Sequence, residues 1–353
     1  GIAAGEYAEN LTSYVRREPI GVCAQIAPWN YPLMMAVWKI GPALAAGNTV
    51  VLKPASTTPE STLELARISQ GILPDGVFNV ILGSGAGAGG RLVAHRVPGL
   101  VSLTGSVAAG VQVAETAART LKRCHLELGG KAPAVVFADT DLAFVAEQLA
   151  GAAYFNAGQD CTAVTRVLVE ASAYDGLVAE LTKAAEATRT GDAEDPETYY
   201  GPLNSASHFA KVASFIDGLP AHAAVATGGH RVGDKGFYYA PTVVTGVRQT
   251  DAIVQEEVFG PVLTVQPFAD LEEAVKLAND VDFGLASSIW TRDHSRVLTL
   301  TRALDFGCVW VNTHIPLVAE FPHGGFKASG YGKDLSAYAI DDYTRVKHVM
   351  SAF

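Results

Sequence analysis

Apolar residues in the first third of the chain form short, near-continuous runs separated by stretches of helical character. Runs of this kind, bounded by glycine, proline or polar residues, predict buried strands. The predicted strands cover 21–27, 48–54, 77–82, 100–104 and 124–128. The predicted helices cover 33–46, 59–70, the segment that follows Gly90, and about 107–119. Apolar strands that alternate with helices form parallel sheets covered on both faces, so the pattern predicts a doubly wound α/β sheet.

One helix start and its end are marked by residue type. Thr58 is expected to be the N-cap of the second helix, with Pro59 at the first helical position and Gly71 ending the helix. A threonine oxygen accepts a hydrogen bond from a free amide of the first turn, and proline has no amide to leave unpaired there.

The alternation starts again after Gly130 and predicts a second α/β domain. Strands are expected at 134–137, 164–169, 285–290 and 308–312, with helices over 141–155 and from 174. The segments 14–20 and 343–353 are strand-like, and we expect them to pair with each other within one chain or between two chains. The predicted domains are oligomerisation strands at 1–20 and 344–353, a cofactor-binding domain at 21–128 and 328–343, and a catalytic domain at 129–327.

Composition narrows the class of protein. The 353 residues are 49% hydrophobic and carry a formal charge of −10, which argues against nucleic acid and anionic membranes as partners. Four widely spaced cysteines without a CxxC pair signal neither a disulfide framework nor a zinc site, and a reducing cytoplasm fits them. We expect no metal, no membrane span and no signal peptide. A first residue that is glycine indicates a processed, tagged or truncated chain.

Polar residues follow four of the predicted strands at their carboxyl ends. They are Asn30, Lys53, Ser106 and Glu127. Ligands of doubly wound sheets bind beyond that edge, so these residues form a candidate site. The turn Gly83-x-Gly85-x-x-x-Gly89 lies between a strand and a helix, where bare backbone amides can approach a phosphate. Its spacing differs from GxGxxG, and a merely flexible turn explains it equally well.

Cys161 lies in a polar, glycine-containing turn between a predicted helix and a predicted strand. A thiol attacks carbon as thiolate, and its ordinary pKa of about 8.5 requires help from its surroundings. Cys161 is therefore a candidate nucleophile, with an inert buried cysteine as the alternative.

Seven motifs in register along essentially the whole chain resemble the aldehyde dehydrogenase superfamily. They are Pro28-Trp29-Asn30-Tyr31-Pro32, Lys53-Pro54, Thr104-Gly105-Ser106, Leu126-Glu127-Leu128-Gly129-Gly130-Lys131, Gly158-Gln159-x-Cys161, Glu257-Val258-Phe259-Gly260-Pro261 and Gly330-Tyr331-Gly332-Lys333. Within the superfamily, the residues around Cys161, Trp310 and His323 are most similar to γ-aminobutyraldehyde dehydrogenases, followed by betaine aldehyde dehydrogenases. The resemblance implies a Rossmann-like cofactor domain, an α/β catalytic domain and a small β oligomerisation element, without the family's N-terminal segment.

The resemblance also implies roles in catalysis. Cys161 would attack the aldehyde carbon, the side-chain amide of Asn30 and the Cys161 amide would hold the oxyanion, and Glu127 would activate water to hydrolyse the thioester. The presence of Glu127 favours formation of the acid over transfer of the acyl group to coenzyme A.

The implied cofactor is NAD. The residues expected to bind it are Ile26, Trp29, Lys53, Ser56, Gly85, Gly89, Thr104, Gly105, Ser106, Glu257 and Phe259. Many relatives that use NAD carry glutamate three residues after the lysine, where this chain has Ser56. Serine neither grips the adenosine 2′-hydroxyl strongly nor repels a 2′-phosphate, so NADP stays open.

The substrate expected is an ω-aminoaldehyde such as 4-aminobutanal. The residues expected to contact it are Tyr31, Trp38, Phe155, Asp160 and Glu320. Carboxylates and aromatic faces attract an ammonium group. The alternative is that Asp160 bonds to backbone and Glu320 is merely solvated. An ionised Asp160 near the sulfur would hinder thiolate formation, so its carboxylate should point away from Cys161.

Two rival functions remain at this stage. One is a betaine aldehyde or general aliphatic aldehyde dehydrogenase, and the other is a catalytically silent fragment. The resemblance implies a homo-oligomer, a dimer or homotetramer built by pairing edge strands.

Overall fold

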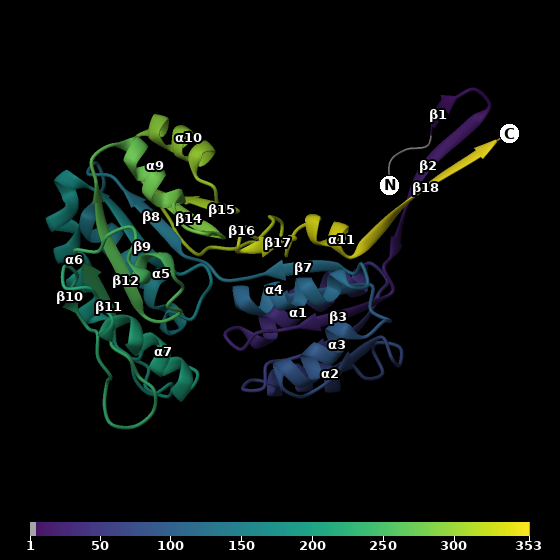
Figure 1. The fold of residues 1–353 in the computed structure, drawn as a ribbon, viewed down its shortest axis with the longest axis horizontal. Coiled ribbons are helices and arrows are strands. Elements are labelled where there is room, and N and C mark those ends of the chain that lie inside the picture. The colour runs from purple at the N-terminus through teal and green to yellow at the C-terminus, as the bar shows by residue number, and fades with distance from the viewer. Residues whose placement is uncertain (1–4, 353) are drawn as a thin grey trace. The chain divides into compact units, whose positions relative to one another are not determined.

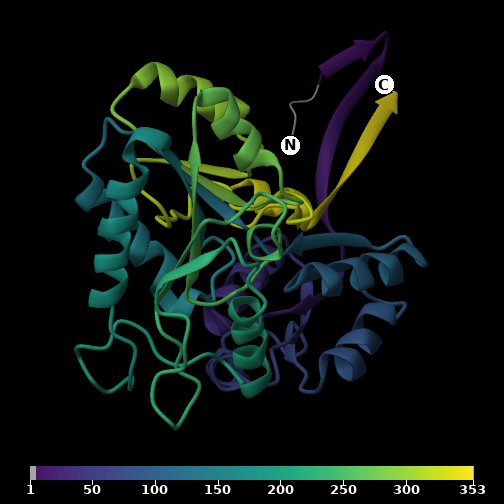
Figure 2. The same ribbon diagram turned by 60° about the vertical axis from the view of Figure 1, so that its left-hand side comes forward.

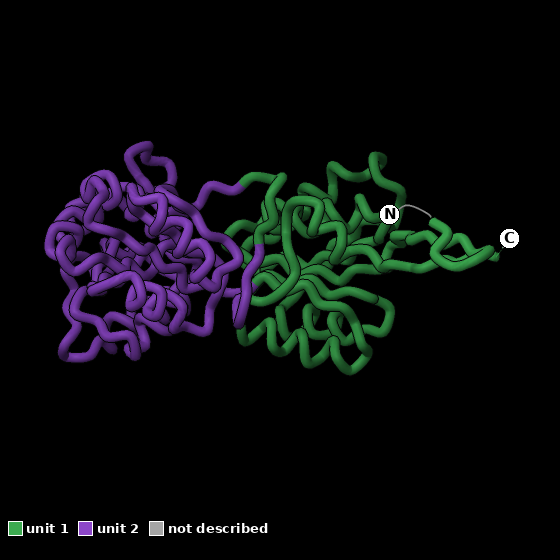
Figure 3. Tube along the Cα trace, turned by 90° about the horizontal axis from the view of Figure 1, so that it is seen from above, with its two compact units in different colours: residues 1–127, 318–323, 330–353 green, residues 128–317, 324–329 purple. Residues whose placement is uncertain are grey.

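A computed structural model describes residues 5–352, which form two compact units (Figure 3). The first unit comprises Gly1–Glu127, Val318–His323 and Gly330–Phe353, and the second comprises Leu128–Leu317 and Gly324–Ser329. Residues 1–4 and 353, which belong to the predicted oligomerisation strands, lie outside the described part of the chain.

The first unit contains a six-stranded sheet with the strand order β17-β7-β6-β3-β4-β5. The strands are β3 (Val22–Ile26), β4 (Thr49–Lys53), β5 (Phe78–Val80), β6 (Leu100–Thr104), β7 (Arg123–Glu127) and β17 (Gly330–Tyr331). The five strands β3 to β7 are parallel, and β17 adds an antiparallel edge beside β7. The predicted parallel sheet is therefore present, and all five of its carboxyl ends lie on one edge.

Helices connect the parallel strands of this sheet. They are α1 (Pro32–Ala45), α2 (Glu60–Ser69), the π-helical turn η1 (Gly85–Gly89), α3 (Gly90–Ala94) and α4 (Val107–Ala118), and α11 (Tyr338–Asp342) follows β17. Pro32 starts α1, where its missing amide costs nothing. The buried face of α1 packs on β3, β4 and β6 through a cluster that contains Met35, Ile40 and Val50.

The start of α2 differs from the prediction. The helix begins at Glu60, Pro59 is its N-cap, and no side chain caps it. Thr58 lies one residue too early: its amide bonds to the Ala55 carbonyl, and its buried hydroxyl has no hydrogen-bond partner. The predicted stop is correct, since the helix ends at Ser69 and Gly71 has a φ of +76°.

The two ends of the described chain form a separate three-stranded sheet of the first unit. Its order is β1 (Gly5–Ala8), β2 (Leu11–Pro19) and β18 (Thr344–Ala352). β18 pairs antiparallel with β2 of the same chain, from Thr344 opposite Pro19 to Ala352 opposite Leu11, and the two strands run side by side in both ribbon views (Figures 1 and 2). Of the two pairings expected, the one within a chain is formed.

The second unit is built on a seven-stranded sheet with the order β10-β11-β12-β9-β8-β14-β15. Its strands are β8 (Ala132–Val136), β9 (Val164–Glu170), β10 (Ala224–Thr227), β11 (Thr242–Thr245), β12 (Val262–Phe268), β14 (Ala286–Trp290) and β15 (Cys308–Val311), and β13 (Phe283–Gly284) pairs separately with β16 (Phe326–Lys327). The helices are α5 (Leu142–Tyr154), η2 (Phe155–Gly158), η3 (Ala171–Ala173), α6 (Tyr174–Ala187), α7 (Ala206–Asp217), α8 (Ala252–Gln255), α9 (Leu271–Asn279) and α10 (His294–Ala303). All neighbouring strands of the large sheet are parallel except β10 and β11.

Strand β8 shows why its residues are apolar throughout. Ala134 and Val136 point into a core shared with α5 and α6, while Val135 and Phe137 enter a second core shared with α9 and α10. A strand with helices on both faces has no polar face, which is why the sequence reads as a continuous apolar run. No helix within residues 5–352 has the length and apolar character to cross a membrane.

Candidate active site

The carboxyl edge of the six-stranded sheet brings several predicted residues into one row. Ile26 lies opposite Lys53 on one side and Leu103 on the other, and Thr104 lies opposite Glu127. The row follows directly from parallel pairing, because each of these residues ends its strand or lies one position from the end.

Lys53, Ile26 and Gly89 are neighbours at this edge. Lys53 is 3% exposed, and its ammonium donates a hydrogen bond of 2.7 Å to the Pro54 carbonyl. Burial lowers the pKa of Lys53. A Cβ added to Gly89 would lie 3.5 Å from Cδ of Lys53 and 3.6 Å from Cδ1 of Ile26. Three of the residues predicted to bind the cofactor are thus held together.

The glycine-rich turn forms the short helical turn η1 with a side-chain cap. The hydroxyl of Ser84 accepts a hydrogen bond of 3.0 Å from the Gly87 amide and caps η1. The exposed Ser56 donates to the Gly83 carbonyl at 3.1 Å. A Cβ at Gly85 would meet nothing within 4 Å, so the backbone there is open to an approaching group.

The segment Thr104-Gly105-Ser106 leads from β6 into α4. The Gly105 amide donates to the Glu127 carbonyl at 3.0 Å, and the Ser106 hydroxyl accepts from the Ala109 amide at 3.3 Å as the N-cap of the helix. These contacts fix the helix start beside the end of β7.

Glu127 is a buried carboxyl at the last position of β7. The residue is 3% exposed, and Nε2 of His323 lies 3.9 Å from Oε2 of Glu127. Burial, followed by the negative charge of Asp334, raises the pKa of Glu127 to about 8. A carboxyl with such a pKa can accept and release a proton near neutral pH, which a general base requires.

Sequence reasoning missed the charged residues that surround Glu127. Lys39 is fully buried in α1, and its ammonium donates to the Ser102 hydroxyl at 3.0 Å. His125 and Asp334 are also buried. The available signal was a lysine and a histidine within segments that are otherwise apolar, because buried charges need partners.

Asn30 lies with Trp29 and Tyr31 in the turn that joins β3 to α1. All three are half-buried, and the Tyr31 carbonyl accepts the Met35 amide at 2.9 Å as the helix begins. Tyr31 and Trp38 pack against the same apolar cluster, and the Trp38 ring meets the His323 ring edge-on at 5.6 Å.

The turn before Cys161 in the second unit has an uncommon backbone. Asn156, Ala157 and Gly158 have φ angles of 51°, 59° and 67°. The first two are costly for residues with a Cβ, and such conformations concentrate at functional sites. Gln159 stabilises the turn, since its side chain donates to the Asn156 carbonyl at 3.0 Å and accepts from the Asn204 amide at 2.8 Å.

Two glycines allow the backbone to approach this turn. A Cβ on Gly130 would lie 2.1 Å from the Cys161 carbonyl oxygen, and one on Gly158 would lie 2.2 Å from the Gly260 carbonyl oxygen. Neither position can accept a side chain without a shift of the backbone. Cys161 itself is half-buried and packs against a cluster that includes Leu285 and Trp310.

Asp160 hydrogen-bonds locally within the turn. Its Oδ1 accepts from the Thr162 amide and from the Thr162 hydroxyl, both at 2.7 Å. Of the two interpretations of Asp160, these contacts match the one in which it bonds to backbone. On the far side of the turn, Nε2 of His314 donates to the Thr162 carbonyl at 2.7 Å. Burial lowers the pKa of His314 to about 4, so the ring is neutral at pH 7.

Glu257 lies against the Gly129-Gly130 backbone. Its Oε1 accepts a hydrogen bond of 2.8 Å from the Gly130 amide, and burial raises its pKa. Phe259, with a φ of 60°, offers its carbonyl to Nε2 of His208 at 2.7 Å.

Phe155 and Glu320, the remaining residues predicted to contact the substrate, are accessible to solvent. Phe155 is 44% exposed in the second unit, and Glu320 is exposed in the first. Asn30 and Glu127 belong to the first unit and Cys161 to the second.

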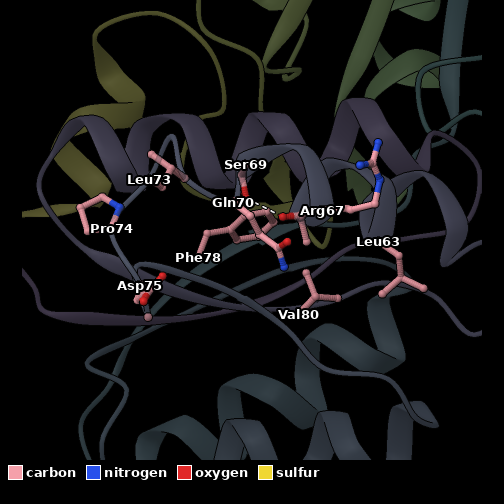
Figure 4. Close-up of a pocket in the computed structure, with 11 residues that line it drawn as sticks. Leu63, Arg67, Ser69, Gln70, Leu73, Pro74, Asp75, Phe78 and Val80 are labelled. Carbon is pink, nitrogen blue, oxygen red and sulfur yellow. Dashed lines mark hydrogen bonds between the residues drawn. The ribbon is translucent and has the colours of Figure 1, made fainter.

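A surface hollow of about 410 Å³ in the first unit is lined by α2, β5 and the segment between them (Figure 4). Figure 4 shows Arg67, Gln70 and Phe78 around it. None of the residues predicted from the sequence lines this hollow.

A parallel sheet with polar residues along its carboxyl edge, together with a cysteine held in a preformed turn, has the parts of a dinucleotide-dependent enzyme with a thiol nucleophile. A sequence model of the aldehyde dehydrogenase family matches residues 3–349. The chain therefore belongs to the aldehyde dehydrogenase family, and the predicted class of enzyme and its fold are confirmed.

Several relatives match almost the entire chain. Betaine aldehyde dehydrogenase of Bacillus subtilis is 44% identical over 343 residues, which are 96% of this chain and 70% of that protein. A mitochondrial aldehyde dehydrogenase of Leishmania tarentolae is 45% identical over 343 residues, 96% of this chain and 69% of that protein. The chain thus spans about 70% of the length of these relatives.

Solved structures share the fold. The structure of betaine aldehyde dehydrogenase from Staphylococcus aureus in complex with NAD+ aligns with a TM-score of 0.97 at 37% identity, covering 99% of this chain and 71% of the other. Lactaldehyde dehydrogenase from Escherichia coli aligns with a TM-score of 0.96 at 36% identity, covering 99% of this chain and 75% of the other.

Proposed function

We propose that the protein oxidises an aldehyde to the carboxylic acid with NAD+ as the electron acceptor and Cys161 as the nucleophile. The observation that carries this proposal is the preformed turn at Cys161. Gly130 lets the backbone approach the cysteine. Gln159 bonds to Asn156 on the amino side of Cys161, and Asp160 accepts from the Thr162 amide on its carboxyl side.

The residues of the chain divide the chemistry between them. The Cys161 sulfur forms a bond to the aldehyde carbon, and the Asn30 amide together with the Cys161 N–H stabilises the oxygen anion that develops. Each such donor contributes about 2.7–4 kcal/mol. Bound NAD+ would supply a hydride acceptor, and loss of the hydride from the Cys161-bound carbon would leave a thioester on the sulfur. Glu127 then takes a proton from water as the water oxygen attacks the thioester carbon, and the carbon–sulfur bond breaks to release the acid and the thiolate.

The residues proposed to hold NAD+ fit a dinucleotide in two separate ways. In the first unit, Lys53 and the open backbone at Gly85 supply an ammonium and amides at the carboxyl edge of the sheet. In the second, the Glu257 carboxylate is oriented by Gly130 and can accept hydrogen bonds from ribose hydroxyls. Ser56 supplies no carboxylate at the position that would select against a 2′-phosphate, so NADP is the competitor to test.

For the substrate we propose an aldehyde with a cationic far end, with 4-aminobutanal as the first candidate. The exposed carboxylate of Glu320 and the aromatic rings of Tyr31, Trp38 and Phe155 would recognise an ammonium group. An attraction of about 4 kcal/mol at 4 Å, halved by desolvation, corresponds to a preference of roughly 30-fold. Betaine aldehyde is the second candidate, because relatives in Bacillus subtilis and Staphylococcus aureus carry that name.

The test is a panel of aldehydes and cofactors followed at 340 nm. 4-Aminobutanal, betaine aldehyde and butanal are compared with NAD+ and NADP+, in the wild type and in Glu320→Gln and Asp160→Asn. We expect kcat/KM for the cationic aldehydes to exceed that for butanal and to fall in Glu320→Gln, with a smaller loss in Asp160→Asn because its Oδ1 already bonds to Thr162. Equal kcat/KM values for butanal and 4-aminobutanal would contradict the proposal of a cationic substrate. If none of the aldehydes gives NADH or NADPH, the proposal that the protein is an active dehydrogenase is wrong.

We also propose that the protein forms a homo-oligomer. We propose further that it acts in the cytoplasm and that its reaction uses no metal ion. β18 is the outer strand of its three-stranded sheet, and an outer strand can pair with a second copy of the chain. Light scattering after size exclusion tests this, and a mass of one chain at micromolar concentration would contradict it.

A further inference from the structure

His125 occupies an unusual place for a charged side chain. It lies in β7 two residues before Glu127, so the two side chains leave the strand on the same face. The residue is 0% exposed. A histidine in the middle of a buried strand needs polar or charged neighbours at its ring nitrogens, because burial otherwise penalises each polar atom.

Both ring nitrogens of His125 face carboxylates. Nε2 lies 3.1 Å from Oδ1 of the buried Asp334, and Nδ1 lies 2.8 Å from Oδ2 of Asp342, whose side chain is 29% exposed. Gly332 permits this approach: a Cβ there would lie 2.6 Å from Nδ1 and 2.9 Å from the Asp342 carboxylate.

Two carboxylate neighbours favour the doubly protonated ring. Burial alone lowers the pKa of His125, but the charge of the nearby Asp334 carboxylate and the hydrogen bond to Asp342 outweigh it and raise the pKa to about 9. At neutral pH the ring is therefore an imidazolium that holds one buried and one partly exposed carboxylate.

The imidazolium is a neighbour of Glu127. A ring nitrogen of His125 and a carboxylate oxygen from each of Glu127 and Asp334 all lie within 4.8 Å of one another. The other titratable groups that face this cluster are Lys39 of α1, Lys333 before α11 and His323, whose Nε2 lies 3.9 Å from Oε2 of Glu127. The Tyr343 ring packs 6.0 Å from His125. Asp334 disfavours ionisation of Glu127, and the positive charges of His125 and Lys39 favour it.

We propose that His125, held as an imidazolium by Asp334 and Asp342, is a positioning residue that keeps Glu127 able to ionise and so sets the lower pH limit of the reaction. This inference rests on the proposed function, in which Glu127 is the base. Without the imidazolium, the Asp334 carboxylate would oppose ionisation of Glu127, and Lys39 would be the principal buried cation left to favour it. Asp342, whose side chain is partly exposed, accepts a hydrogen bond from Nδ1 of His125, so it acts on Glu127 only by stabilising the imidazolium.

A purely structural role for His125 makes a different prediction. As a clamp between β7 and the segment 334–342, His125 would affect stability but would leave the ionisation of Glu127 unchanged. The chain supplies a matched control for this distinction, because Nε2 of His222 lies 2.9 Å from Oδ2 of Asp251 in the second unit.

The experiment compares wild type, His125→Gln, Asp342→Asn and the control His222→Gln. The titration of the Glu127 carboxyl is followed by carbon-13 NMR, assigned with Glu127→Gln, and the pH profile of kcat is measured in parallel. We expect the Glu127 titration and the acid limb of kcat to move upward by about one pH unit or more in His125→Gln, because a positive charge less than 5 Å away is lost. A smaller upward shift is expected in Asp342→Asn, and none in His222→Gln.

The outcomes separate this inference from the proposed function. An unchanged Glu127 titration in folded His125→Gln would overturn the inference. A shifted titration without a shifted kcat profile, or full activity in Glu127→Gln, would overturn the assignment of Glu127 as base. If His125→Gln does not fold, the Asp342→Asn titration and the wild-type imidazole decide: an imidazole that loses its proton near pH 6.5 would overturn the inference, and one that stays charged up to about pH 8 supports it.

Discussion

The Gly130 amide donates a hydrogen bond of 2.8 Å to Oε1 of Glu257. This bond orients a carboxylate with the backbone of a segment that also touches the carbonyl of Cys161. The Gly129-Gly130 pair therefore supports two predicted functions. It orients Glu257 for cofactor binding, and it allows the backbone to pack against Cys161, the predicted nucleophile.

Gly129→Ala is expected to weaken NAD+ binding by about tenfold or more while the protein stays folded. The added Cβ would lie 2.5 Å from Oε2 of Glu257, and a single carboxylate can move away where backbone could not. Calorimetric titration with NAD+ measures the effect. Gly41→Ala in α1 is the control, since its Cβ would meet nothing within 4 Å. An unchanged affinity would mean that the position of Glu257 is irrelevant to the cofactor.

Gly130→Ala is expected to be more severe. Its Cβ would lie 2.1 Å from the Cys161 carbonyl oxygen, and a backbone atom cannot swing aside as a side chain does. We expect a loss of at least about 2 kcal/mol of unfolding free energy, measured by urea denaturation. Gly201→Ala, also in the second unit and with open space around its Cβ, should change stability little. Equal stabilities of the two variants would show that the contact relaxes at no cost.

Cys161→Ser is expected to abolish NADH formation and leave the thermal transition within a few degrees of wild type. Serine is close in volume, but its hydroxyl is a far weaker nucleophile without a dedicated base. The comparison is Cys23→Ser, which replaces a fully buried thiol of the first unit and should lower stability but retain turnover. Turnover in Cys161→Ser would identify a different nucleophile.

The buried pair His125 and Glu127 predicts that stability falls as pH rises from about 6.5 to 9. His125 has a raised pKa in the folded state, so its contribution is complete below its ordinary pKa of 6.5 and is lost as the pH rises through about 9. Glu127 acts in the same direction, because its folded pKa of about 8 lies above its ordinary value and the unfolded chain ionises first.

Thermal melts between pH 6 and 9.5 provide the measurement. The wild type should lose on the order of 3 kcal/mol over this range from His125, with a further loss from Glu127, and His125→Gln should show a clearly flatter dependence. His222→Gln should retain the wild-type slope. Parallel curves for wild type and His125→Gln would show that the histidine does not change its charge between these pH values.

Sequence patterns predicted the elements whose environment is uniform. β6 covers Leu100–Thr104 as expected, because a strand with helices on both faces is mostly apolar, with Ser102 as a buried polar exception that accepts from Lys39. The same logic placed Lys53 and Glu127 at strand ends, where the apolar run stops. Asp141 marked the start of α5, where it caps the Phe144 amide.

The sequence could not show pairings between residues far apart in the chain. Lys39 and His125 stand out as polar positions in apolar segments, but Asp334 and Asp342 follow His125 by more than 200 residues, and no local pattern links them. The start of α2 was placed one residue early because threonine and proline both favour helix starts and only the backbone geometry decides between their positions.

The ladder between β2 and β18 has a consequence for synthesis. The nine-residue partner of β2 lies more than 300 residues later in the chain, so it is synthesised well after β2. Until residues 344–352 have been made, β2 keeps an unpaired backbone edge that other chains can bind. Completion of this sheet is thus a late step of folding, and a nascent chain that stalls before residue 344 would expose a strand prone to association.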